Sequence, residues 1–147
     1  MPTTATSHPV ALANRLRPVL LKLNRHLRRE IHSLGVTGGQ VSLLNTLQQN
    51  PSIGMTELAH HEGFSAPALS KYVDRLEAAG LVRREPSATD RRRVGLKLTA
   101  EGDRVLRSVK QRRTAWLADR MKHLDARELK ALEQAVVPLA RLVEDEE

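Results

Sequence analysis

The apolar residues of this chain follow a helical spacing along most of its length and depart from it once, between Leu81 and Leu98. In the helical stretches they recur every three or four residues, which places them on one face of each helix. Between residues 81 and 98, two short apolar runs flank a charged segment with turn-forming residues, a pattern typical of a β-hairpin. The sequence therefore predicts a mainly α fold with one small β-hairpin inserted between helices.

The scarcity of aromatic residues fits a helical core. Phe64, Tyr72 and Trp116 are the only aromatic residues among 147, whereas hydrophobic residues as a whole make up 40%. A core of Leu, Val, Ala and Ile suits helices packed on helices, and the hydrophobic fraction is that of an ordinary globular domain. So few rings also argue against the single-strand nucleic-acid binders that stack bases on aromatic side chains.

The first expected helix follows a loose N-terminal arm of residues 1–9 and ends at Gly35, because glycine readily adopts the conformation that closes a helix. Pro18 lies early in this helix, so either the helix begins near it or it is kinked there. The apolar stripe of this helix consists of Leu16, Leu20, Leu23, Leu27, Ile31 and Leu34.

Capping residues delimit the other helices, since Ser, Thr and Asp favour helix starts and Gly favours helix ends. Asp125 with Glu128 three residues later has the form of a capping box, and Pro138 should kink the helix that follows. The remaining signals are Thr37 at the start of the second helix, Asn50-Pro51 at its end, Gly63 after a third helix over 56–62, Ala79-Gly80 after a fourth over 66–79, and Thr99 at the start of the fifth.

The third and fourth helices have the spacing of a helix-turn-helix, in which a short turn containing glycine leaves the second helix free to enter a major groove. The turn is Glu62-Gly63-Phe64-Ser65. The hairpin that follows is expected to act as a wing, which reaches phosphates or a neighbouring minor groove. The sequence thus predicts a winged helix-turn-helix.

Positive charge is concentrated in the same region. The chain has a formal net charge of +7, yet no Lys or Arg occurs between Arg29 and Lys71. Residues 65–98 then contain eight Lys and Arg against four Asp and Glu. Such a distribution indicates a polyanionic partner or a membrane surface, although a solvated basic surface is the simpler alternative.

The segment from Leu76 to Gly102 resembles the MarR family of transcription regulators. It reads LEAAGLVRR at residues 76–84 and DRRRVGLKLTAEG at residues 90–102. The hallmark of the family is Asp-x-Arg in the wing and Leu-Thr-x-x-Gly at the start of the next helix. The matching residues are Asp90, Arg92, Leu98, Thr99 and Gly102. Length and helix order agree as well, so the resemblance extends over essentially the whole chain.

The resemblance implies a homodimer, joined through its N- and C-terminal helices, that binds double-stranded DNA at a pseudo-palindromic operator. It implies residues 1–35 as the N-terminal arm and dimerisation helix, residues 36–102 as the DNA-binding region and residues 103–147 as the C-terminal dimerisation helices. Many proteins of the family repress nearby genes and release DNA when a small-molecule effector binds. The apolar stripe of the first helix, which exceeds what one small lobe needs to bury, also favours a homodimer.

In the fourth helix, Leu69, Val73 and Leu76 should be buried, which leaves the opposite face toward DNA. Ser70 can hydrogen-bond a base edge or a phosphate, and Lys71 is better suited to a phosphate. Three simpler alternatives stay open: exposed polar residues without a DNA contact, Arg75 paired with Asp74 or Glu77, and Thr56 as a helix cap rather than a phosphate ligand. The residues predicted to bind DNA in the two helices are Thr56, Ser65, Ala66, Pro67, Ser70, Lys71 and Arg75.

Three consecutive arginines, Arg91, Arg92 and Arg93, stand at the tip of the expected wing. Arginine suits this position because its planar fork pairs with phosphate and favours the negative potential of a narrow groove. An acid in a DNA-facing loop is unfavourable unless it orients a neighbouring arginine. The family resemblance gives Asp90 this supporting role and favours Arg92 as the DNA contact.

Other chemistries find little support. The chain has no cysteine, which excludes disulfides and thiolate metal sites. The adjacent His60 and His61 point to different faces of a helix, so no metal site is predicted. No catalytic motif occurs, and neither an enzyme nor a cofactor is expected. No run approaches the about 20 apolar residues of a membrane span, and the N-terminus lacks a signal-peptide pattern, so we expect a cytoplasmic protein without a membrane partner.

The function predicted from these features is a sequence-specific, DNA-binding transcription regulator, with repression and release by an effector as the expected mode. An architectural protein that coats DNA through charge alone is the main alternative. A shaped recognition helix with a wing favours the regulator, because a coating protein needs neither.

Overall fold

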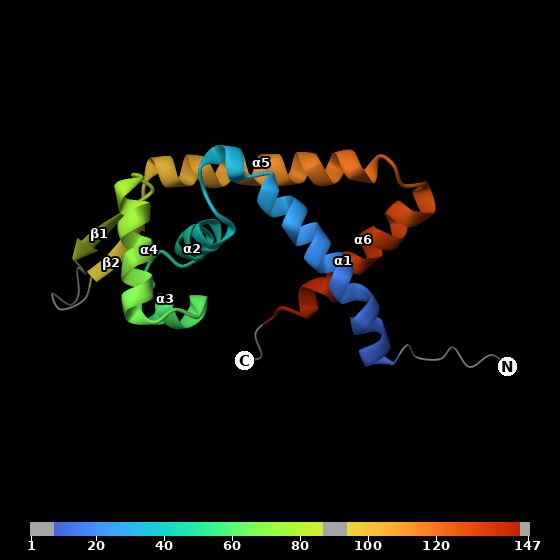
Figure 1. Ribbon diagram of the computed structural model, residues 1–147, viewed down its shortest axis with the longest axis horizontal. Helices are drawn as coiled ribbons and strands as arrows, with labels where there is room; N and C mark the ends of the chain where they lie inside the picture. The colour runs from blue at the N-terminus through green and yellow to red at the C-terminus, as the bar shows by residue number, and fades with distance from the viewer. Residues whose placement is uncertain (1–7, 87–93, 145–147) are drawn as a thin grey trace. The chain divides into compact units, whose positions relative to one another are not determined.

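The computed structural model describes residues 8–86 and 94–144 (Figure 1). The chain folds into two compact units, Met1–Arg113 and Thr114–Glu147. In chain order the elements are α1 (Pro9–Arg29), a 3₁₀ turn η1 (His32–Leu34), α2 (Gly38–Gln49), α3 (Met55–Glu62), α4 (Ala66–Ala78), β1 (Val82–Pro86), β2 (Val94–Leu98), α5 (Ala100–Met121) and α6 (Ala126–Arg141). This order confirms the prediction of a mainly α chain with one inserted hairpin. Among the described helices, none combines the length and the apolarity that crossing a membrane requires.

The end predicted for the first helix at Gly35 is wrong, and so is the alternative that the helix begins near Pro18. The helix starts at Pro9, because proline in the first turn loses no hydrogen bond and its fixed φ is already helical. It continues through Pro18 and stops at Arg29, and Ile31 turns inward and becomes fully buried. The chain then makes the η1 turn, which ends at Gly35 with a φ of 76°. The stripe assigned to one helix is therefore divided between a helix and a buried turn.

The other helix boundaries agree with the capping signals. The Thr37 side chain accepts a hydrogen bond from the Gln40 backbone N–H at 3.2 Å, and the Gln40 side chain accepts one from the Thr37 backbone N–H at 3.0 Å. Asp125 and Glu128 form the same reciprocal pair at the start of α6, at 2.8 and 3.2 Å. Such capping boxes satisfy backbone donors that the first turn of a helix leaves free.

The core lies in the first unit, between α2, α3, α4, the hairpin and the start of α5. It includes the predicted inward residues of α4, and α2 contributes Val41, Leu43, Leu44 and Leu47. The buried apolar residues are Ile31, Val36, Val41, Leu43, Leu44, Leu47, Leu58, Ala59, Leu69, Val73, Leu76, Leu81, Val82, Leu96, Leu106 and Val109. Neither α1 nor α6 contributes a buried residue.

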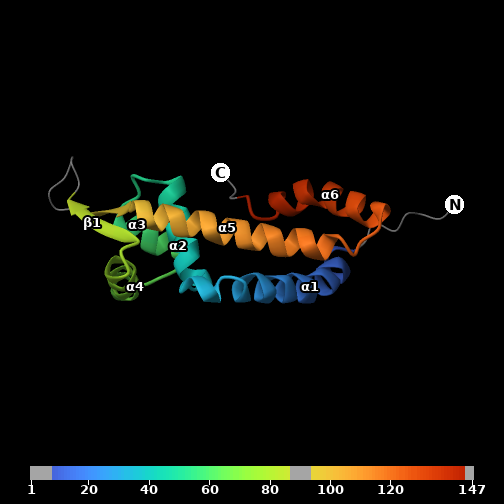
Figure 2. The same ribbon diagram turned by 90° about the horizontal axis from the view of Figure 1, so that it is seen from above.

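The hairpin is a two-stranded antiparallel sheet. Val82 lies opposite Leu98, and Pro86 lies opposite Val94. Both views place β1 next to α4 (Figures 1 and 2). An isolated bridge between Gly54 and Gly95 connects the start of α3 to the second strand. The sheet therefore packs on the two helices of the helix-turn-helix.

Candidate nucleic-acid interface

The turn between α3 and α4 is built on Gly63, which has a φ of 72° and ends α3. That conformation favours glycine, because a Cβ would be strained there. The Phe64 backbone N–H donates to the Ala59 carbonyl at 2.8 Å and closes the turn. Ser65 then begins α4 by accepting a hydrogen bond from the Ala68 backbone N–H at 3.3 Å. The helix-turn-helix predicted from the sequence is present.

We call α4 the recognition helix, because one of its faces is buried and the opposite face is exposed. Leu69, Val73 and Leu76 are at most 1% exposed, as the periodicity predicts. The predicted DNA-facing residues of this helix all lie on its exposed side: Ala66, Pro67, Ser70, Lys71 and Arg75, together with the exposed cap Ser65. The structure thus leaves these side chains accessible, and their contacts with DNA stay predictions.

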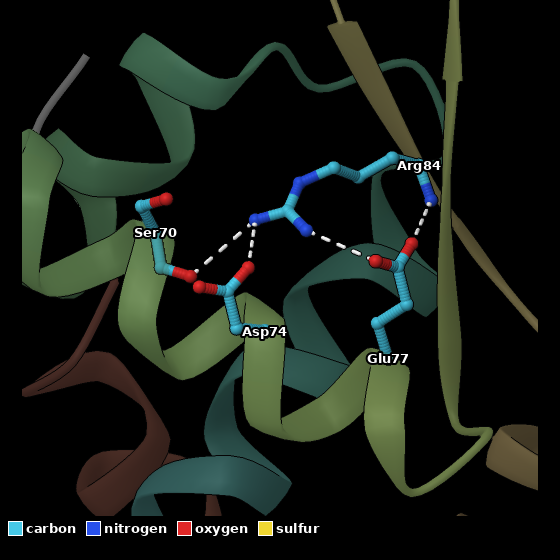
Figure 3. Close-up of polar contacts among 4 residues, drawn as sticks. All are labelled: Ser70, Asp74, Glu77 and Arg84. Carbon is cyan, nitrogen blue, oxygen red and sulfur yellow. Dashed lines mark hydrogen bonds and ion pairs between the residues drawn. The ribbon is translucent and has the colours of Figure 1, made fainter.

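Arg84, on β1, connects the hairpin to the recognition helix through hydrogen bonds (Figure 3). Its guanidinium donates to the Asp74 carboxylate at 2.7 Å and to the Glu77 carboxylate at 3.0 Å. A third, longer bond reaches the Ser70 backbone carbonyl at 3.4 Å. The Arg84 backbone N–H donates to the other oxygen of Glu77 at 3.0 Å. Four hydrogen bonds therefore join one residue of the strand to three successive turns of the helix.

The electrostatics of this cluster favour a positive recognition surface. The hydrogen bond to Asp74 is the largest effect that raises the pKa of Arg84, and the charges of Asp74 and Glu77 add to it, while partial burial acts in the opposite direction. Arg84 offsets one of the two negative charges of Asp74 and Glu77. The positive charges of Lys71 and Arg75 on the exposed face outweigh the other one.

The alternative that Arg75 pairs with Asp74 or Glu77 is wrong within the part of the chain that the structure describes, because both acids bind Arg84. Arg84 itself is not among the site residues predicted from the sequence. The signal for it was the pair Asp74 and Glu77, three residues apart on one helix face and shortly before a strand that contains two arginines.

Thr56 is exposed in the first turn of α3, and it is not the cap of that helix. Gly54 occupies the cap position, and no side chain caps this helix. The capping alternative for Thr56 is therefore wrong, and its hydroxyl stays a candidate phosphate ligand.

The predicted wing-tip residues Asp90, Arg91, Arg92 and Arg93 lie outside the described residues. The strands that lead to them end at Pro86 and begin again at Val94. Their roles stay as the sequence predicts them.

The base of the wing explains the Leu-Thr-x-x-Gly motif. The Thr99 hydroxyl donates to the Gly80 carbonyl at 2.6 Å and accepts from the Gly102 backbone N–H at 3.0 Å. The Thr99 backbone N–H donates to the Leu81 carbonyl at 3.1 Å. A Cβ on Gly102 would overlap the carbonyl oxygen of Leu81, the residue before β1, so only glycine permits the first turn of α5 to lie this close to it.

Comparison with known proteins identifies this arrangement. The sequence model of the MarR family matches residues 36–94. The transcriptional regulator HosA of Escherichia coli is 34% identical over 99 residues, which are 66% of this chain and 73% of HosA. This chain belongs to the MarR family. The HTH-type transcriptional repressor MdtR of Bacillus subtilis is 28% identical over 132 residues, 90% of this chain and 85% of MdtR.

A solved MarR structure has the same fold. Wild-type MarR from Escherichia coli in its apo form matches with a TM-score of 0.73 and 28% identity, over 90% of this chain and 97% of that chain. As a MarR family member, the chain is a DNA-binding transcription regulator with a winged helix-turn-helix. Regulators of this family bind DNA and act as dimers. Within the described residues, no group of three or more His, Asp or Glu side chains is placed to hold a metal ion.

Proposed function

We propose that two copies of this chain form a homodimer that binds a pseudo-palindromic DNA operator, represses nearby genes and leaves the DNA when a small molecule binds. The observation that carries the proposal is the recognition helix, whose exposed face carries Ser70, Lys71 and Arg75 beside a hairpin fastened by Arg84. A helix of this kind fits the major groove, where base edges can be distinguished.

In the proposed interface, some residues contact base edges and others contact phosphates. Ser70 reads a base edge or a phosphate, and Lys71 and Arg75 supply positive charge on the same face. Ser65, Ala66 and Pro67 lie at the start of α4, and Thr56 lies in the first turn of α3. In the wing, Arg91, Arg92 and Arg93 meet the backbone or minor groove, with Asp90 as the orienting acid.

Uncovered apolar side chains on α1 and α6 support the dimer. On α1, Val19 is 52% exposed and Leu21 is 58% exposed, and on α6, Val136 and Val137 are 63% and 67% exposed. Exposed apolar surface of this extent is characteristic of an interaction site. The proposal assigns residues 1–35 and 103–147 to dimerisation and residues 36–102 to DNA binding.

Repression is supported by the name of MdtR, a transcriptional repressor that matches along most of both chains. The relatives compared are transcription regulators, and no catalytic activity is proposed for this chain. A regulator acts where the chromosome lies, so the proposal places the protein in the cytoplasm of a bacterial cell.

A titration of the promoter fragment next to the protein's own gene tests this function. We expect binding to survive an excess of random duplex at near-physiological salt, because specific complexes of this kind are typically about 10³-fold or more tighter than non-specific ones. Complete displacement by random duplex would favour a protein that coats DNA through charge alone. Transcription from the bound promoter should fall when the protein is added, and a rise would contradict repression.

A further inference from the structure

A recess with a volume of about 320 Å³ lies between α3 and the start of the recognition helix. Figure 1 shows α3 leading directly into that end of α4. The exposed rim of the recess is formed by Thr56 and His60 of α3 and by Ala66, the first residue of α4. Thr56 and Ala66 are among the residues predicted to bind DNA, so the recess opens on the predicted DNA-facing surface.

The inner part of the recess is apolar. Ala59 and Leu69 are buried, and Met55 and Phe64 are half-buried and pack against the core. Among the described residues that line the recess, none is an Asp, Glu, Lys or Arg. A surface of this kind is stabilised when it removes apolar atoms of a partner from water.

The recess is held in shape by the turn between the two helices. The Phe64 backbone N–H donates to the Ala59 carbonyl at 2.8 Å, so a hydrogen bond joins two of the lining residues directly. On the other side, the Ser65 hydroxyl caps the turn of α4 to which Ala66 belongs. A preformed recess spends little binding free energy on ordering its own residues, which favours a specific contact.

The chemistry of the major groove indicates what fits such a recess. The base edges present hydrogen-bond donors and acceptors there, and the C5 methyl group of thymine is the apolar group among them. A donor or acceptor placed against the recess would lose its bonds to water without replacement, whereas a methyl group has none to lose. The recess therefore favours thymine over the other bases.

We propose that this recess receives the C5 methyl group of one thymine in each half of the operator, and that Ala66, Met55 and Leu69 thereby determine specificity at that base pair. The inference rests on the proposed function, to which it adds the identity of one base. Ser70 is exposed and lies four residues after Ala66, on the same side of α4, so it contacts a neighbouring base pair. Alanine suits the rim because a larger side chain there would fill the recess.

Titration of the full-length protein on operator duplexes that contain deoxyuridine tests the inference, because deoxyuridine lacks only the methyl group of thymidine. The operator is the segment that the protein protects in the promoter of its own gene, and thymines are replaced there in symmetric pairs. At one pair, affinity should fall by about tenfold, since burial of each methyl group contributes about fourfold. If every pair leaves the affinity unchanged, the inference is overturned.

A second set of duplexes separates the methyl group from hydrogen bonding at the same base pair. Cytosine in place of the critical thymine, opposite guanine, changes the donors and acceptors and also removes the methyl group. 5-Methylcytosine restores only the methyl group, at the same position of the ring, and should recover about fourfold in affinity for each half of the operator. Equal affinities for cytosine and 5-methylcytosine would contradict an apolar contact.

The variant Ala66→Leu locates the contact. Leucine would fill the recess, so affinity for the thymine operator should fall and the ratio of affinities for thymine and deoxyuridine should move toward one. Ala78→Leu is the matched control, because it adds the same atoms at an exposed position of α4 that does not line the recess, and the ratio should persist. Thermal melts establish that both variants are folded. A ratio that Ala66→Leu leaves intact would place the methyl group elsewhere on the protein and overturn the inference.

These titrations distinguish a failure of the inference from a failure of the proposed function. Operator binding that survives an excess of random duplex but does not respond to any methyl group would retain the proposed function and overturn the role of the recess. Displacement of the protein from its promoter by random duplex would overturn both.

Discussion

Arg84 joins the wing to the recognition helix through side chains that the sequence separates by seven and ten residues. The Arg84 side chain is 29% exposed, less than the side chain of either acid that it binds. An isolated surface ion pair contributes little to stability, but this one is part of a cluster that also binds backbone groups. At the scale of single residues, Arg84 thus supplies the polar contacts between β1 and the exposed side of α4.

Arg84→Gln should lower the free energy of unfolding by about 1 kcal/mol, because it removes two ion pairs that are partly shielded from water. It should also lower affinity for operator and for random duplex alike, since Asp74 and Glu77 become unpaired on the face that meets phosphates. Urea unfolding and DNA titration at one salt concentration measure the two effects. Arg83→Gln is the control, because Arg83 is 66% exposed and binds only Glu85 within its own strand among the described contacts. Equal stability and equal DNA affinity of the two variants would contradict the role of Arg84.

Gly102→Ala should destabilise the fold, because the added methyl group overlaps the Leu81 carbonyl and approaches the Leu98 side chain. Because the Leu81 backbone cannot move aside as a flexible side chain does, we expect the free energy of unfolding to fall by about 1–3 kcal/mol. Gly95→Ala serves for comparison, since its Cβ would meet only the Glu85 carbonyl at an ordinary 3.6 Å. Thermal unfolding of both variants measures the difference. A melting temperature as high for Gly102→Ala as for Gly95→Ala would show that the close approach is not required.

At the scale of elements, α4 and the hairpin are expected to contribute differently to DNA binding. The exposed face of α4 carries Ser70 and Lys71, one turn from its start, where a helix that enters a groove end-on is closest to base edges. The hairpin leads toward arginines that suit any phosphate backbone. Specificity is therefore expected from the helix, and general affinity from the wing.

A double change, Ser70→Ala with Lys71→Ala, should lower operator affinity more than affinity for scrambled duplex, because base contacts discriminate by about 1–3 kcal/mol each. Arg92→Ala should lower both affinities alike and reduce the salt dependence by about one unit for each phosphate that the variant no longer neutralises. Titrations of both variants on both duplexes, at several salt concentrations, make the comparison. Equal losses on the two duplexes for the double change would place Ser70 and Lys71 on phosphates.

The elements differ in how far the sequence predicts them. Capping residues are local signals, so Thr37, Ser65 and Asp125 locate helix starts that the structure confirms. The end of α1 is not local, because it depends on Ile31 finding space in a core built by later residues. The pairing of Arg84 likewise requires the strand to be placed against α4. The apolar recess gives no local signal either, since the residues that line it come from both helices of the helix-turn-helix and from the turn between them.

At the scale of the whole molecule, the apolar residues form two populations that differ in exposure to solvent. One is fully buried between residues 31 and 109, and it is sufficient to explain the winged helix-turn-helix. The other remains open on α1 and α6, where Leu132 is 43% exposed and Leu20 is 42% exposed. The proposed homodimer would bury the second population and so explains its presence.

A dimer should therefore persist at micromolar concentration, and its melting temperature should rise with protein concentration. Two recognition helices in such a dimer lie roughly 34 Å apart, which matches one turn of duplex. Leu132→Glu should shift the dimer toward monomer and weaken operator binding, as sedimentation and DNA titration would measure. Gln134→Glu adds the same charge at an exposed polar position of α6 and should leave assembly intact. A folded wild-type monomer at these concentrations would contradict the dimer.

The pairing of Asp74 and Glu77 with Arg84 also affects how fast the protein finds DNA. Charges act over about 10 Å at moderate salt, so the field in front of α4 acts before any contact forms. Arg84 offsets one of the two acid charges, so Lys71 and Arg75 leave this face positive and an approaching duplex meets an attractive surface from the first encounter. Electrostatic steering changes association rates more than dissociation rates. The ion pairs that hold the wing in place thereby set the rate of capture, although none of their atoms needs to touch the nucleic acid.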